Sequence, residues 1–132
     1  MDAANTSWIS DSFIISPKIG NEMLFGASIL KVEQLLHGKL YRISGADKGA
    51  FSFRDVEFYF DKGELFRIFC EKPNPNTDGL IKVGMQVNSV IKKLAKNNII
   101  IKPKDEDSLA IVNSKAVLGV DNGRISWWTN ER

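Results

Sequence analysis

The sequence has few of the residues that catalytic and metal sites most often use. It holds one cysteine, Cys70, and one histidine, His37, in 132 residues. A single cysteine excludes an intramolecular disulfide, and with one histidine it leaves too few ligands for a common zinc site. A Ser-His-Asp or Cys-His catalytic system would have to use His37, which precedes Gly38 at a predicted helix end. We interpret His37 as a capping residue, and we expect no enzyme activity, no cofactor and no metal.

The chain also lacks a strong excess of one charge. Eighteen Lys and Arg residues against sixteen Asp and Glu residues give a formal net charge of +2, spread along the sequence. Proteins that bind nucleic-acid backbones usually carry a concentrated basic stripe, so the sequence does not favour a nucleic-acid partner. The only cluster of one sign is Asp105, Glu106 and Asp107, interpreted as a solvated turn or as a contact for a basic partner.

Long apolar runs are missing as well. The richest run, Ile99 to Ile101, is far too short to span a bilayer, and the first residues have no secretory signal pattern. With one free cysteine, these features predict a cytoplasmic protein without a membrane partner. A chain of 132 residues, 43% hydrophobic and 26% charged, is typical of one globular domain.

Two similar hairpin sequences indicate an internal repeat. FYFDKGELFRIFC at 58–70 is followed, sixty positions later, by LGVDNGRISWWTN at 118–130. Each is preceded by a predicted helix and short strands, and KPNPNTDG lies between them as a connector. We divide the single domain 1–132 into an N-terminal arm (1–19), a first repeat (20–71) and a second repeat (79–130). The predicted fold class is α+β, with two tandem helix-plus-antiparallel-sheet repeats that share one sheet and carry their helices on one face.

Counting outward from the two hairpin turns predicts the faces of this sheet. The turns pair Phe60 with Leu65 and Val120 with Ile125. Strict alternation of side chains along each strand then assigns these residues to the helix-covered face: Val56, Phe58, Phe60, Leu65, Phe69, Ala116, Leu118, Val120, Ile125 and Trp127. Arg67 also falls there, an awkward position for a charge. The second face is predicted to carry these residues: Glu57, Tyr59, Phe66, Ile68, Val117, Ser126 and Trp128.

The second face has two interpretations. The N-terminal arm, with Trp8 and a predicted short edge strand around Phe13 to Ile15, could fold across it, since exposed apolar patches are uncommon. Alternatively, the face is open and binds a partner.

The repeated segments resemble a known architecture. LFGASILKVEQLL and KVGMQVNSVIKKL, each followed by strands and an Asp-Gly hairpin (YFDKGELFRI and GVDNGRISWW), are similar to the helix-plus-sheet repeat of β-lactamase-inhibitor proteins and outer-membrane assembly lipoproteins. The likeness runs from Gly20 to about Trp128, although Gln86 replaces the capping Ser28. The same tandem architecture without a signal resembles small cytoplasmic immunity proteins of bacterial toxin systems, including those of contact-dependent growth inhibition.

The resemblance implies a non-enzymatic protein that neutralises a cognate toxin domain by binding it. The alternative is a small-molecule enzyme or ligand carrier that uses a cavity between helices and sheet. For the first function we predict that the partner docks on the second face, on apolar anchors steered by charges. The predicted binding residues are Tyr59, Phe66, Ile68, Trp128, Asp105, Glu106 and Asp107.

Overall fold

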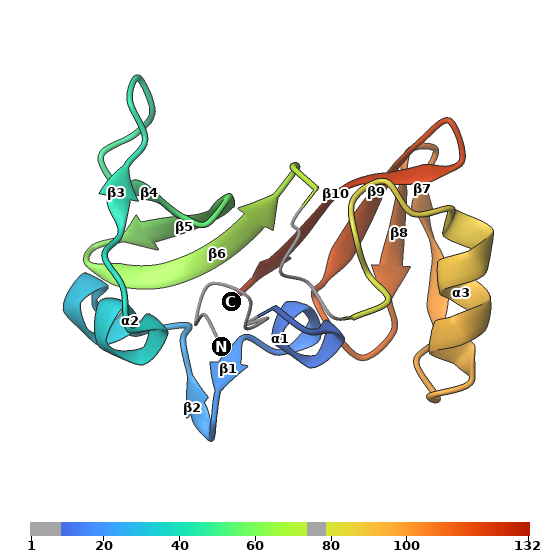
Figure 1. The fold of residues 1–132 in the computed structure, drawn as a ribbon, viewed down its shortest axis with the longest axis horizontal. Helices are drawn as coiled ribbons and strands as arrows, with labels where there is room; N and C mark the ends of the chain where they lie inside the picture. The colour runs from blue at the N-terminus through green and yellow to red at the C-terminus, as the bar shows by residue number, and fades with distance from the viewer. Residues whose placement is uncertain (1–8, 74–78) are drawn as a thin grey trace, which may run out of the picture.

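The computed structural model describes residues 9–73 and 79–132, which form an α+β fold (Figure 1). The elements are α1 (Asp11–Ile15), β1 (Lys18–Ile19), β2 (Glu22–Met23), α2 (Ile29–Leu36), β3 (Tyr41–Arg42), β4 (Ala50–Phe53), β5 (Val56–Asp61), β6 (Glu64–Cys70), α3 (Val87–Ala95), β7 (Ile101–Asp105), β8 (Ser108–Ile111), β9 (Val117–Asp121) and β10 (Arg124–Glu131). Eight strands form one antiparallel sheet in the order β3-β4-β5-β6-β10-β9-β8-β7, and β1 pairs with β2 in a separate hairpin. The predicted α+β class is confirmed.

One hydrophobic core joins the three helices to one face of the sheet. It combines Phe13 of α1, Val32 of α2 and Leu94 of α3 with sheet residues such as Phe58 and Ile125. In the described part of the chain, no helix is long and apolar enough to cross a membrane.

The two central hairpins have the same turn geometry. Lys62 and Gly63 have φ values of 51° and 79°, and Asn122 and Gly123 have 51° and 74°. Two consecutive residues with positive φ are the mark of a type I′ turn, whose twist matches that of the flanking strands. The predicted pairs next to each turn, at 60 with 65 and at 120 with 125, are confirmed.

A loop glycine before each helix binds the hairpin of its own half. The Gly26 N–H donates to the Leu65 carbonyl oxygen at 2.8 Å, and the Leu65 N–H donates to the Ala27 carbonyl at 2.9 Å. In the second half, the Gly84 N–H donates to the Ile125 carbonyl at 2.7 Å, and the Ile125 N–H donates to the Met85 carbonyl at 2.9 Å. The two halves therefore share both a turn type and a backbone hydrogen-bond pair.

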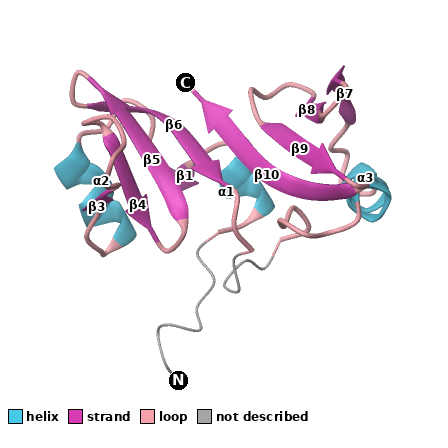
Figure 2. Cartoon of the chain, turned by 90° about the horizontal axis from the view of Figure 1, so that it is seen from above, coloured by secondary structure: helices cyan, strands magenta, loops and turns pink. Residues whose placement is uncertain are grey.

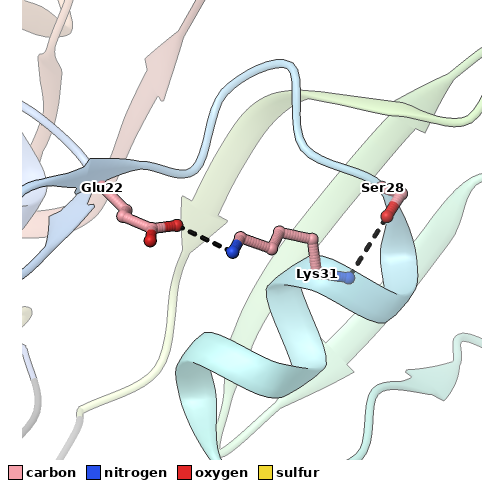
Figure 3. A network of polar contacts seen from close by, with 3 residues as sticks. All are labelled: Glu22, Ser28 and Lys31. Carbon is pink, nitrogen blue, oxygen red and sulfur yellow. Dashed lines mark hydrogen bonds and ion pairs between the residues drawn. The ribbon is translucent and has the colours of Figure 1, made fainter.

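Helix α2 begins where the sequence predicts. The Ser28 hydroxyl oxygen accepts a hydrogen bond from the Lys31 N–H at 3.2 Å, which satisfies one of the free donors of the first turn. The Lys31 ammonium lies 3.0 Å from Glu22, so an exposed ion pair connects α2 to β2 (Figure 3). Gln86 precedes α3 and makes no side-chain capping bond.

Glycine and asparagine favour the left-handed conformation that often ends a helix, which predicts Gly38 in this role after α2 and Asn97 or Asn98 after α3. After α3, Asn98 has a φ of 64°, as predicted. After α2 the left-handed residue is His37, with a φ of 53°, and not Gly38. His37 is thus the C-cap of α2.

The N-terminal arm forms a helix, and the predicted edge strand from Phe13 to Ile15 is wrong. Phe13 and Ile14 of α1 are buried in the core, and the Asn130 side-chain amide donates to the Ile14 and Ile15 carbonyl oxygens at 2.8 Å each. The described part of the arm therefore lies on the helix side of the sheet and does not cover the other face. Trp8 lies outside the described residues.

Asp11, the first residue of α1, binds the chain that follows the connector. Its carboxylate accepts hydrogen bonds from the Leu80 N–H and from the Ile81 N–H, both at 2.9 Å from Oδ1. Ile81 is fully buried, so these bonds fix the place where the chain enters the second half.

We expect Asp11→Ala to lower the free energy of unfolding by about 2 kcal/mol, because it removes charge-assisted bonds from two backbone donors. Urea denaturation measures the change. Asp47→Ala removes an exposed carboxylate from the β3-β4 connection and is the matched control, with an expected change below about 0.5 kcal/mol. Equal small changes in the two variants would contradict the role of Asp11.

A β-bulge interrupts β6 three residues after Gly63. Phe60 pairs with Leu65, but Tyr59 pairs with Arg67, so Phe66 is an extra residue without a partner in β5. Side chains alternate with a period of two, and one extra residue therefore exchanges the faces of all later positions in that strand.

The same irregularity occurs in β10, three residues after Gly123. Ile125 pairs with Val120, while Trp127 pairs with Gly119, so Ser126 is the extra residue. Both bulges stand at the same distance from their turns, another feature common to the two halves.

Residues that follow the bulges in β6 and β10 lie on the face opposite to the predicted one. Ile68 and Trp128 were predicted on the second face, but they are 0% and 2% exposed and belong to the core. Phe69 and Trp127 were predicted in the core, and they lie with Arg67 on the opposite face, partly exposed.

Candidate docking surface on the open face of the sheet

The face of the eight-stranded sheet that points away from the helices is called the outer face here. Figure 2 shows the molecule from above, with β5, β6 and β10 in front of α1 and α2. The buried side chains of α1, α2 and α3 all join the core on the other side of the sheet. Within residues 9–73 and 79–132, no helix covers the outer face.

Four side chains form a continuous stack across β5, β6 and β10, which we call the outer ladder: Tyr59, Arg67, Phe69 and Trp127. The Arg67 guanidinium carbon lies 5.3 Å from the centre of the Tyr59 ring and 5.5 Å from the centre of the Phe69 ring. The Phe69 and Trp127 ring centres are 6.2 Å apart, with 32° between the ring planes. These distances are within the range of cation–π and aromatic contacts.

Neighbouring groups hold the ladder in place. The Arg67 Nε–H donates to the Thr129 hydroxyl oxygen at 3.3 Å, and that hydroxyl donates to the Ile68 carbonyl at 2.7 Å. The Trp127 indole lies against the backbone of Gly119, where a Cβ atom would stand 2.1 Å from Cε2. A side chain at position 119 would therefore displace the indole ring.

The Tyr59 end of the ladder is bound to a carboxylate. The Tyr59 hydroxyl donates to Glu57, the residue two positions earlier on the same face. Burial of the phenol, followed by this hydrogen bond, raises the pKa of Tyr59 from 10.0 to about 12.

We expect Tyr59 to ionise only near pH 12, which a titration of tyrosinate absorbance measures by comparison with Tyr59→Phe. Glu57→Gln should lower the pKa of Tyr59 part of the way towards 10, since burial remains. Because the folded-state pKa is raised, the stabilisation linked to this phenol is present below pH 10 and is lost as pH rises to about 12. An unchanged pKa of Tyr59 in Glu57→Gln would contradict the contribution assigned to the hydrogen bond with Glu57.

The central strands of the outer face carry more carboxylates than cations. By register, the outward positions of β5, β6, β9 and β10 carry five carboxylates and two guanidinium groups: Glu57, Asp61, Glu64, Asp121, Glu131, Arg67 and Arg124. Basic side chains lie at the β7 edge of the same face and at the chain end: Lys102 by register, Lys104 and Lys115 around a hollow with Glu131, and Arg132, whose guanidinium lies 2.7 Å from Glu64.

The structure brings only part of the predicted binding set together. Tyr59 lies on the outer face as predicted, and Phe66 is 36% exposed at its bulge. Ile68 and Trp128 cannot bind a partner directly, because the bulges turn them into the core. Arg67, Phe69 and Trp127 take their place on the outer face.

The acidic residues Asp105, Glu106 and Asp107 form the exposed turn region between β7 and β8. Asp105 pairs with Ser108, Ser108 pairs with Gly119, and Gly119 pairs with Trp127, so the turn lies on the same cross-strand row as Trp127. Three strand spacings amount to roughly 14 Å. The Asp107 N–H donates to the Asp105 carboxylate at 2.9 Å, and this bond lowers the pKa of Asp105.

The hollows described on the outer face are small. One of about 250 Å³ is lined by Lys104, Lys115, Val117 and Glu131. Another of about 210 Å³ beside Glu57 is also lined by Asp55, Ser52 and Lys72, and it is smaller than most small-molecule sites. Two others, of about 340 and 330 Å³, open on the helix side. The space between α3 and the sheet is too small to admit a water molecule. In the described ranges, no group of three His, Cys, Asp or Glu residues could hold a metal ion.

Comparison of the chain with protein-family models, curated proteins and solved structures finds no match.

Proposed function

We propose that this chain is a non-enzymatic binding protein that holds a protein partner on its outer face. The observation that carries the proposal is the outer ladder, a row of Tyr, Arg, Phe and Trp side chains over which no helix of the described chain lies. Trp, Tyr and Arg are the residue types that most often dominate binding energy at interfaces. Because stacking and the Thr129 hydrogen bond already fix the ladder, binding orders few additional side chains.

The size of the outer face is sufficient for a stable complex. Eight strands at about 4.8 Å spacing span roughly 34 Å. A standard interface takes about 800 Å² from each partner, which a sheet of this width can supply.

The partner we propose is a cognate bacterial toxin domain, which the protein neutralises in the cytoplasm by direct binding. The support is the likeness of the tandem helix-plus-sheet repeats to immunity proteins, together with an open face that suits binding. In such a protein the fold positions a surface, and no reacting group is needed.

A growth-rescue assay tests this function. The wild-type chain is used to capture its partner from the source cells, and the partner domain is then expressed in bacteria with or without the chain. We expect the partner to arrest growth and the wild-type chain to restore it. The Tyr59→Ala/Trp127→Ala variant should fail to restore growth, while Leu30→Ala, which truncates a 73% exposed side chain on α2, should succeed. A harmless partner, or rescue by the double variant, would contradict the proposal.

A further inference from the structure

The outer ladder already shows how this face holds a cation. The Arg67 guanidinium is within cation–π distance of both the Tyr59 and the Phe69 ring, at 5.3 and 5.5 Å from their centres. Trp127 continues the stack beyond Phe69, and in the described chain no Lys or Arg lies over its ring. One indole face rests on Gly119, so the opposite face points away from the sheet.

Two carboxylates lie near this indole by strand register. Trp128 pairs with Cys70, and continuing that antiparallel register by one residue places Glu71 opposite Trp127. Glu57 pairs with Phe69, the neighbour of Trp127 in the stack. A cation over an indole gains from the ring quadrupole and also from nearby negative charges.

The charge around the ladder favours the same kind of ligand. Glu57, Glu131 and, by register, Glu71 outnumber the single guanidinium of Arg67, so this part of the face attracts a basic group and repels phosphates. Single-stranded nucleic acid also stacks on aromatic platforms, but those platforms carry positive charge along the backbone path. A basic protein segment therefore fits this surface better than a nucleic acid does.

We propose that the partner presents a Lys- or Arg-rich segment to the outer face and that one of its cationic side chains stacks on Trp127, between Glu57 and Glu71. This inference rests on the proposed function and names the chemistry of its partner. The added cation would make with Trp127 the same kind of contact that Arg67 makes with Tyr59 and Phe69.

The test uses the full-length chain labelled with ¹⁵N and short Gly-Ser peptides of matched length as probes. One peptide carries several Arg residues, a second carries citrulline at the same positions, a third carries Glu, and the fourth probe is a short oligo-dT. The Trp127 indole N–H signal, assigned by its loss in Trp127→Phe, reports binding. We expect the Arg peptide to move this signal at low salt, and the citrulline, Glu and oligo-dT probes to leave it in place.

Variants test the assigned contacts. Glu57→Gln combined with Glu71→Gln should weaken binding of the Arg peptide by about threefold or more. Trp127→Leu should do the same, with its binding followed through the backbone amide signals that the Arg peptide shifts in the wild-type chain. Leu30→Ala should leave it unchanged. Equal or larger shifts of the Trp127 signal with the Glu peptide or with oligo-dT would overturn the inference, as would no shift with the Arg peptide.

The captured partner separates this inference from the proposed function. If the partner perturbs the Trp127 signal and the Arg peptide does not, the proposal of a Lys- or Arg-rich segment is wrong, and the proposal that the partner docks on the outer face is kept. If neither perturbs it, both are wrong.

Discussion

Trp128→Ala is expected to lower the free energy of unfolding by roughly 3 to 5 kcal/mol, the range for truncating a large aromatic side chain in a core. Trp128 is 2% exposed and belongs to the same core as Phe58 and Ile125. Its removal leaves a cavity that rigid strands on both sides cannot fill. Urea denaturation, with the slope of the transition compared between variants, measures the loss.

The neighbouring residue provides the control. Trp127 points to the outer face and is partly exposed, so Trp127→Ala should cost about 1 kcal/mol or less. The two substitutions remove the same atoms from adjacent positions of one strand, and only the face differs. A larger loss of stability from Trp127→Ala than from Trp128→Ala would mean that the bulge at Ser126 is not present in solution.

Trp127→Ala should instead weaken binding of the captured partner by about 2 kcal/mol or more, which is a factor of roughly 30 in affinity. The indole is the largest group of the outer ladder, and Gly119 and Phe69 hold it in one orientation. Surface plasmon resonance gives both rate constants, and the loss should appear mainly as faster dissociation. Leu30→Ala, on the helix side, is the control and should bind as the wild type does.

Neutralising the acidic turn should have a different kinetic effect. Asp105→Asn combined with Asp107→Asn removes exposed charges on the same row as Trp127, so association should slow and its salt dependence should flatten. If these changes affected only dissociation, the turn would be a direct contact and not a steering charge.

The sequence predicts the elements of this fold better than their faces. Asn122-Gly123 and Lys62-Gly63 mark the hairpins because type I′ turns need positive φ at both central residues, and β6 ends at Cys70, the last residue of the predicted hairpin segment 58–70. Apolar spacing likewise locates α2 and α3. These signals depend on residues that are close together in the sequence, so they can be recognised without the tertiary structure.

The bulges are the reason that two of the seven predicted binding residues, Ile68 and Trp128, lie in the core. Packing between neighbouring strands decides whether a bulge forms at Phe66 or Ser126. The local sequence pattern does not contain this information. One signal was present: strict alternation placed the Arg67 charge in the core, and a single inserted residue removes that conflict. The adjacent tryptophans gave no such signal, because either one could have been the buried residue.

The arm was mispredicted for a related reason. Phe13 to Ile15 is β-branched and aromatic, typical of a strand, yet Ser10 caps a short helix there and Asn130 binds its carbonyl groups. Tertiary contacts from the far end of the chain thus override local propensity.

Hydroxyl-radical footprinting of Trp127 and Trp128, in the free chain and in its complex with the captured partner, tests the docking surface most directly. The two indoles are adjacent in sequence and lie on opposite faces of β10, so each serves as the reference for the other. We predict that Trp127 is oxidised in the free chain and protected in the complex, while Trp128 reacts little in both states. Equal oxidation of Trp127 with and without saturating partner would show that the partner binds elsewhere.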